Sequence, residues 1–315
     1  MNDTDSVVIR DAATGGRASI AVARGMNCYS WLPRGQGDAD EVLWAEPGFA
    51  GGTGRPSGSG IPILFPFPGR IGGGRFTWQG RAFELPEGDG RGNALHGFVL
   101  DRPWHVSSRE ESHVTSTFRA SRDLEGWDSL WPADFELTCR YEIEPNALSC
   151  TITVANPGSS VLPCGLGLHP YFRLDADHPD ARLELPVVKE YELEGLIPTG
   201  VQRRLSDASD RGVRWPLAGR SWDNVYGNLG DAAERISATA VDGARGRRVT
   251  ISWDRRCFPY TVVYTPGHRK AVCIEPYSTL PDAFALEAKG IPSGRWSLEP
   301  GASVEATVTL SVAAM

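Results

Sequence analysis

Alternation between apolar and polar side chains, the period of a β-strand, is the feature of this sequence that most limits its fold. From residue 135 to residue 154 every second residue is apolar on either side of Pro145-Asn146. Apolar residues at every second position face one side of an extended strand, and a Pro-Asn step favours a turn. The segment therefore predicts a long antiparallel hairpin with one buried face.

Shorter runs of the same kind predict more strands along the chain. A second hairpin is expected at residues 75–85 with its turn at Gln79-Gly80, a third at 247–265, and a fourth at 295–312 with its turn at Pro300-Gly301. The 36 glycines and 23 prolines separate these runs, as expected of many strands joined by many turns.

Helical patterns are scarce. Residues 282–289 predict a turn or two of helix, and no amphipathic helix of three turns is present. Strands do not alternate with helices and no internal repeat stands out, which disfavours a doubly wound parallel sheet as well as a propeller or solenoid. The sequence therefore predicts an all-β fold, a large antiparallel sandwich.

We expect residues 1–315 to form a single domain. A chain of this length is long enough for two domains, but all-β domains of this size are common. The glycine-rich stretch at residues 48–60 resembles a linker. Because the strand signals on its two sides are incomplete without each other, we interpret it as a long surface loop inside the domain.

Charge and hydropathy exclude several classes of partner. A net charge of -7, with no basic run, argues against nucleic acid, and no apolar run is long enough to cross a bilayer. The N-terminus is acidic where a signal peptide needs a cationic start and an apolar run. We therefore expect a soluble, cytoplasmic protein, in which the six cysteines are free, mostly buried thiols.

Several titratable side chains stand at the ends of apolar runs, beside glycine, proline or aromatic residues. They are His96, His169, Asp223 and Glu275. That context suits a polar side chain that projects into a cleft from the end of a rigid strand. Structural roles are also open: a core position for His96, a corner for His169 and a turn cap for Asp223. Glu275 directly follows an apolar run, where a carboxylate needs a partner or a function.

Taken together, these segments resemble the aldose 1-epimerase (galactose mutarotase) family. The resemblance runs along nearly the whole chain, with motifs in the family's order and spacing: PILFPFPGRI, NALHGF, GLGLHPYF, WDNVY and IEPYSTLPDAF. It implies a large antiparallel β-supersandwich and a site in which Glu275 is the general base and His169 the general acid. It also implies that His96, Arg70 and Asp223 hold the sugar. The chain departs from the family at Gly69, where asparagine is more common.

The implied reaction interconverts the α and β anomers of an aldohexose such as glucose or galactose. A base removes the proton of the C1 hydroxyl, an acid protonates the ring oxygen, and the two exchange roles on closure. No metal ion or other cofactor is required. Aromatic rings pack on the C–H faces of sugars, and we expect Tyr171 and Trp222 to line the cleft. The only expected partner is the small sugar, bound by a monomer or homodimer.

Three alternatives remain open. The chain also resembles the hexose-6-phosphate 1-epimerases, but Gly58 and Leu100 stand where that branch has arginines that suit a phosphate. Arg55, Arg75 or Arg102 could replace them. A non-catalytic sugar-binding protein on the same sandwich would have little reason to keep both an acid and a base. A metal-dependent hydrolase is disfavoured because neither HxH nor HExxH is present.

Overall fold

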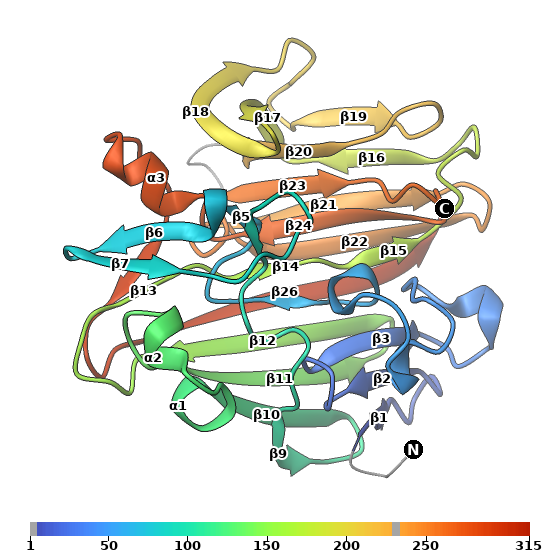
Figure 1. The fold of residues 1–315 in the computed structure, drawn as a ribbon. Helices are drawn as coiled ribbons and strands as arrows, with labels where there is room; N and C mark the ends of the chain where they lie inside the picture. The colour runs from blue at the N-terminus through green and yellow to red at the C-terminus, as the bar shows by residue number, and fades with distance from the viewer. Residues whose placement is uncertain (1–4, 229–233) are drawn as a thin grey trace.

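The fold consists almost entirely of antiparallel β-sheet (Figure 1). The structure is a computed structural model that describes residues 5–228 and 234–315. Within these residues the α-helices are three short ones, α1 (Ala120–Asp123), α2 (Trp127–Leu130) and α3 (Ala283–Ala288). The predicted all-β class is confirmed, and α3 falls in the segment where a turn or two of helix was expected.

Two large sheets make up most of the fold, and Figure 1 shows the larger one with β9 at its lower edge and β19 at its upper edge. Its nine strands follow the order β19 (Val213–Pro216), β16 (Arg182–Leu185), β21 (Arg235–Asp242), β22 (Arg247–Asp254), β26 (Ser303–Ala314), β12 (Ala147–Ala155), β11 (Glu136–Glu144), β10 (His113–Arg119), β9 (His105–Arg109). The second sheet follows the order β18 (Ile197–Arg204), β17 (Val187–Glu194), β20 (Asp223–Asn228), β23 (Tyr260–Tyr264), β24 (Ala271–Tyr277), β14 (Gly167–Leu168), β4 (Ile63–Leu64), with β15 (Tyr171–Arg173) also paired to β24.

Smaller elements complete the fold. They are a three-stranded sheet of β1 (Val7–Arg10), β2 (Arg17–Ala21) and β3 (Asn27–Leu32), and the pairs β13 (Leu162–Cys164) with β25 (Trp296–Leu298), β5 (Arg70–Ile71) with β8 (Ala94–Leu95), and β6 (Arg75–Trp78) with β7 (Arg81–Glu84). Short 3-10 turns lie at Asp38–Asp40, Phe49–Gly51, Pro56–Gly58 and Gly72–Gly74.

The main core lies where the inner faces of the large sheets meet. Along β11 and β12 every second side chain is buried, as the alternation predicted, and these side chains join one large apolar cluster. Strand β24 differs, because all seven of its residues are buried. It lies between β23 on one side and β14 and β15 on the other. A strand buried on both faces is a rigid support for functional side chains.

Two of the four predicted hairpins are confirmed and two are wrong. The strands β11 and β12 pair along their whole length, and β6 pairs with β7 across Gln79-Gly80. In contrast, β22 and β23 belong to different large sheets, because the five residues between them carry the chain across the sandwich. At the C-terminus β25 pairs with β13, whereas β26 pairs with β12 and β22.

The six cysteines are all free thiols, and only Cys257 is partly exposed. Among residues 5–228 and 234–315, no helix has the length and apolar character that crossing a bilayer requires. Residues 1–4, which begin the acidic N-terminus, lie outside the described residues.

Candidate active site

A cavity of about 600 Å³ lies at the middle of the eight-stranded sheet. Its lining includes Glu275 of β24, His169 from the β14–β15 connection and His96 from the segment after β8. These residues are far apart in the sequence, and the sheet pairing of β14 with β24 brings two of the three elements together. The three side chains are nearly inaccessible, with exposed fractions of 1%, 6% and 8%. The structure thus gathers the predicted acid, base and second histidine into one site.

Glu275 lies near the centre of β24, opposite Val262 of β23. Side chains two apart on a strand share a face, so Tyr277 points the same way. The Tyr277 hydroxyl donates a hydrogen bond of 2.9 Å to Glu275 Oε2, and both groups are buried. Burial raises the pKa of Glu275 well above its ordinary value, and the hydrogen bond from Tyr277 opposes that rise.

His169 is held in place by its backbone and by an aromatic neighbour. Its N–H donates to the carbonyl oxygen of Pro62, which ties it to the strand segment before β4. Its ring stacks on Tyr171 with centroids 4.7 Å apart and planes 5° apart. Burial lowers the pKa of His169 to about 3, so the imidazole is neutral at neutral pH.

The imidazole and the carboxylate face each other. His169 Nε2 lies 3.4 Å from Glu275 Oε1, a contact that a small movement turns into a hydrogen bond. Burial disfavours the charged form of both groups, since it raises the pKa of Glu275 and lowers that of His169. A buried imidazole–carboxylate pair that shares one proton is suited to moving protons to and from a bound hydroxyl.

His96 has a fixed hydrogen-bonding role. The Gly69 N–H donates to His96 Nδ1 at 3.2 Å, so in the neutral ring the proton is on Nε2 and can be donated. Burial keeps the ring neutral by lowering its pKa well below its ordinary value. The backbone of His96 is left-handed, with φ 63°, which few residues other than glycine adopt. Strain of this kind is frequent at functional sites, where it aims a side chain.

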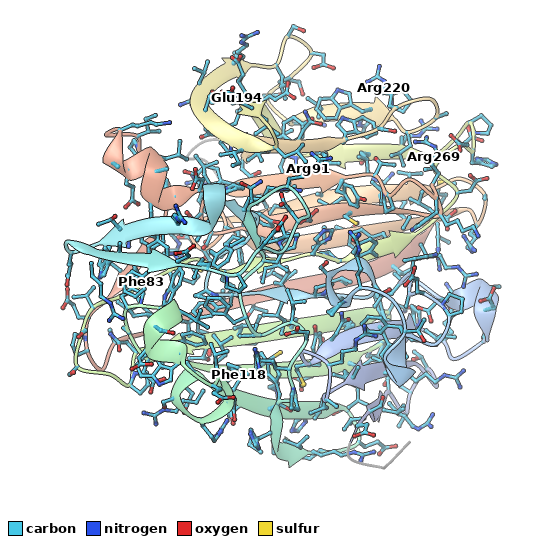
Figure 2. All side chains as sticks on the ribbon, viewed as in Figure 1. Phe83, Arg91, Phe118, Glu194, Arg220 and Arg269 are labelled. Atoms are coloured by element: carbon cyan, nitrogen blue, oxygen red, sulfur yellow. The ribbon has the colours of Figure 1, made fainter. Side chains whose placement is uncertain are left out.

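Two polar residues form the outer walls. Arg70 donates through Nε to Asp89 at 2.9 Å, so its guanidinium is positioned while its other nitrogens remain free among the described residues. Burial alone would raise the pKa of Asp89, but hydrogen bonds from Asn93, the Arg91 backbone and Arg70 hold it well below its usual range. Asp223 is half-buried, and no other described side chain donates to its carboxylate, which leaves it open to sugar hydroxyls. Figure 2 labels Arg91, which also lines this cavity.

The loop at residues 48–60, expected on the surface, forms part of the cavity wall. Gly54, Arg55, Ser57 and Gly58 line the cavity. Arg24 anchors the loop by donating hydrogen bonds to backbone carbonyls of residues 49, 53 and 54. The loop is therefore ordered against the site.

The two predicted aromatic contacts have different outcomes. Tyr171 lines the cavity, although its closest ring contact is His169. Trp222 is not among the residues that line the cavity: it stacks on Trp215 at 5.9 Å and lines a separate depression. The reason is strand alternation, which turns the neighbour of a cavity-facing residue such as Asp223 to the opposite face.

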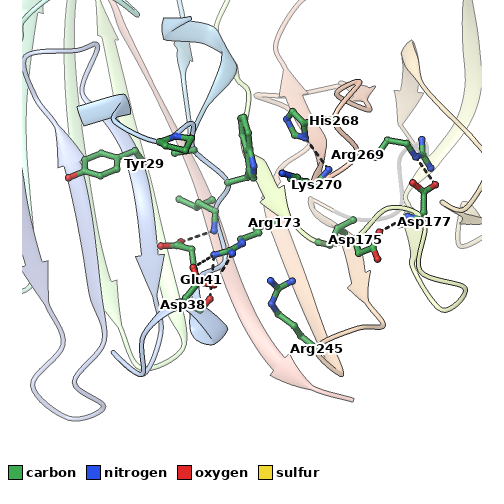
Figure 3. Close-up of a pocket in the computed structure, with 15 residues that line it drawn as sticks. Tyr29, Asp38, Glu41, Arg173, Asp175, Asp177, Arg245, His268, Arg269 and Lys270 are labelled. Atoms are coloured by element: carbon green, nitrogen blue, oxygen red, sulfur yellow. Dashed lines mark hydrogen bonds and ion pairs between the residues drawn. The ribbon is translucent and has the colours of Figure 1, made fainter. Parts of the chain in front are cut away.

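A second cavity, of about 850 Å³, adjoins the first and shares Trp44 and His268 with it. Figure 3 shows two ion pairs among its charged side chains. Arg173 pairs with Asp38, and Arg269 with Asp177. Because these two arginines are already paired, and the buried Glu275 and His169 line the smaller cavity, the smaller cavity is the candidate active site.

Comparison with known proteins decides the family. The family described as aldose 1-epimerase matches residues 7–311. The chain belongs to the aldose 1-epimerase family. Members of this family are isomerases that act on carbohydrates. Among solved structures, a galactose mutarotase-like protein from Clostridium acetobutylicum superposes with a TM-score of 0.83 at 22% identity, over 98% of this chain and 95% of that one.

Two relatives from Escherichia coli (strain K12) are named only as uncharacterized proteins. YphB is 27% identical over 47% of this chain and 49% of its own length, so that match spans about half of the relative. YihR is 28% identical over 70% of each chain. The structural likeness confirms the predicted galactose mutarotase-like fold.

Two contacts of the site were missed at the sequence level. One is the hydrogen bond from Tyr277 to Glu275, although their spacing of two was a signal that both face the same way. Asp89, the partner of Arg70, lies in an irregular segment where no sequence pattern indicates a contact.

Proposed function

We propose that this protein interconverts the α and β anomers of an aldohexose such as glucose or galactose, with Glu275 as general base and His169 as general acid. The observation that carries the proposal is the buried pair itself: His169 Nε2 and Glu275 Oε1 lie 3.4 Å apart on the floor of a cavity. A cavity of this size accommodates one pyranose ring.

In the proposed reaction Glu275 takes the proton of the C1 hydroxyl while His169 protonates the ring oxygen, and the ring opens. Rotation about C1–C2 turns the aldehyde over, and closure reverses both proton transfers. The Nε2–H of His96 donates to the sugar near the ring oxygen. Asp223 and Arg70 hold sugar hydroxyls from the outer walls. The steps need no covalent intermediate.

The number of protons shared by Glu275 and His169 decides whether the pair can catalyse the reaction. With no proton shared between Glu275 and His169 there is no acid, and with both groups protonated there is no base. Burial raises the pKa of Glu275 and lowers that of His169, which favours the form with the single proton on the carboxyl group, and in the proposed reaction the bound sugar shifts this proton to His169. Retention of both groups in one buried site also favours an enzyme over a non-catalytic sugar-binding protein.

The test is mutarotation of freshly dissolved α-D-glucose and α-D-galactose, followed by polarimetry against buffer alone. We expect the optical rotation to reach equilibrium faster with the protein for at least one sugar. Equal rates with and without protein, for both of these sugars and for their phosphates, would refute the proposed activity.

A second candidate substrate is a phosphorylated aldohexose, favoured by two arginines of the cavity. Arg55 and Arg91 line the cavity, and neither guanidinium forms an ion pair within the described part of the chain. A phosphate group binds well to such charged, forked donors. The other two possible substitutes lie elsewhere, since Arg75 pairs with Glu84 and Arg102 donates to a backbone carbonyl oxygen.

Glucose and glucose 6-phosphate compared in one assay separate the two substrates. If the phosphate is the substrate, Arg55→Gln and Arg91→Gln raise its KM while leaving that of glucose nearly unchanged, and Arg75→Gln, the control, changes neither. Equal effects of Arg55→Gln on both sugars would remove the phosphate interpretation.

A further inference from the structure

One group of side chains in the site has a composition that the epimerase reaction does not need. Cys273 lies two residues before Glu275 on β24, and strand alternation turns both toward His169. One ligand atom from each of His169, Cys273 and Glu275 lies within 4.8 Å of the others, and all three residues are buried. A proton-transfer pair needs the imidazole and the carboxylate but has no use for a thiol.

The ligand types and spacing match those of zinc. Zn²⁺ takes thiolate, imidazole and carboxylate ligands in tetrahedral geometry, at about 2.0–2.3 Å from the ion. Ligands of such a site are about 3.3–3.6 Å apart, by simple tetrahedral geometry from those bond lengths. His169 Nε2 and Glu275 Oε1 already lie 3.4 Å apart, so the ion needs only a closer approach of the Cys273 sulfur.

The surroundings leave room for the ion and for its fourth ligand. Glu275 and His169 line the 600 Å³ cavity, from which a water molecule or a sugar hydroxyl can complete the coordination. Tyr171 and Tyr264 pack against Cys273 from the side, which keeps the sulfur beside the pair. His169 Nδ1 is buried with no hydrogen-bond partner among the described residues, so no hydrogen bond at Nδ1 opposes a small shift of the ring toward the ion.

We propose that His169, Cys273 and Glu275 bind one Zn²⁺ ion, and that the bound ion inhibits the protein. The binding stands on the geometry alone, whereas the inhibition rests on the proposed function. Zinc bound here occupies the lone pairs of both the general base and the general acid, so neither can exchange a proton with the sugar. Magnesium, which prefers an octahedral set of oxygen ligands, does not suit this site.

Binding is tested without an activity assay. Co²⁺ is added to the metal-free protein, and the near-ultraviolet band of a cobalt–thiolate bond is recorded. We expect one equivalent of cobalt to produce the band, Zn²⁺ to displace it and Mg²⁺ to leave it. Cys273→Ser and Cys273→Ala should abolish the band, while Cys257→Ser, which removes a partly exposed thiol that does not line the cavity, should retain it. A band that persists in Cys273→Ser, or no band in the wild type, would overturn the proposal.

Inhibition is measured on the same proteins, each relative to its own rate in the presence of a chelator. We expect saturating Zn²⁺ to lower the wild-type rate at least about tenfold. Loss of the thiol ligand should weaken zinc affinity by more than about tenfold, because loss of a residue that only hydrogen-bonds to a metal ligand already weakens metal affinity by about that factor. Equal zinc sensitivity in the wild type and in Cys273→Ser would contradict the proposal. If no sugar is turned over, the cobalt band still shows whether the three residues bind a metal ion. Failure of the proposed function and failure of the zinc site are therefore distinguishable.

Discussion

The hydrogen bond from Tyr277 to Glu275 makes a prediction about the pH dependence of the reaction. In the buried site this 2.9 Å bond stabilises the ionised carboxylate, and so opposes the rise in the pKa of Glu275 that burial causes. A hydrogen bond to a charged group contributes about 1.5–3 kcal/mol. Tyr277→Phe removes this contribution and is therefore expected to raise the pKa of Glu275 further.

Two changes in the kinetics follow from this shift. The value of kcat/KM for the wild type should fall at high pH, where the pair loses its single proton, and Tyr277→Phe should move that fall to higher pH. Near pH 7 the ionised base becomes scarcer, so kcat/KM of the variant should be about 10- to 100-fold lower. Both are measured by polarimetry across a pH series, with a chelator present throughout.

Tyr191→Phe is the matched control, because Tyr191 is a buried tyrosine of the same sheet that does not line the cavity. It should leave both the rate and the pH profile unchanged. A Tyr277→Phe protein that is folded by circular dichroism and keeps the wild-type alkaline limb would refute the assigned hydrogen bond.

Two further variants test the groups around the pair. His96→Asn keeps a residue that tolerates the left-handed backbone but removes the Nε2–H donor, and should lower kcat/KM about 10- to 100-fold. The control is His113→Asn, at an equally buried histidine outside the cavity, which should leave kcat/KM unchanged. Equal kcat/KM values for the two variants would contradict the role of His96. Gly69→Ala should lower the free energy of unfolding in urea by more than Gly73→Ala does. Both glycines have positive φ, which costs a residue with a side chain about 1–2 kcal/mol. Only at Gly69 would the new Cβ also meet a neighbour, 2.6 Å from Pro281 Cγ, so equal losses would contradict the close contact.

The alternation of apolar and polar residues predicted where the strands lie better than it predicted which strands pair. The hairpin of β11 and β12 was predictable because its alternation and its turn lie within about 20 residues. The strands β22 and β23 were also predicted, but the pattern carries no information on which sheet each strand joins. Short connections that cross a sandwich look the same in sequence as hairpin turns.

The site was predictable as a set of motifs and only partly as a set of contacts. His169 and Glu275 come together through the pairing of β14 with β24, which joins segments about 100 residues apart. The family resemblance supplied that long-range information, and the alternation of side chains did not. Trp222 shows the converse: its position beside a motif suggested a contact, yet alternation turns it away from the cavity.

Replacement of Glu275 by glutamine tests the central claim most directly. The change keeps the size of the side chain and its place on β24 but removes the base, so the rate of mutarotation above buffer should fall by about two orders of magnitude or more. Glu190→Gln, on β17 of the same sheet and outside the cavity, controls for the loss of a negative charge from that sheet. The account predicts a folded Glu275→Gln protein with almost no activity and a Glu190→Gln protein with the wild-type rate. A folded Glu275→Gln protein that turns over the sugar at the wild-type rate would contradict it.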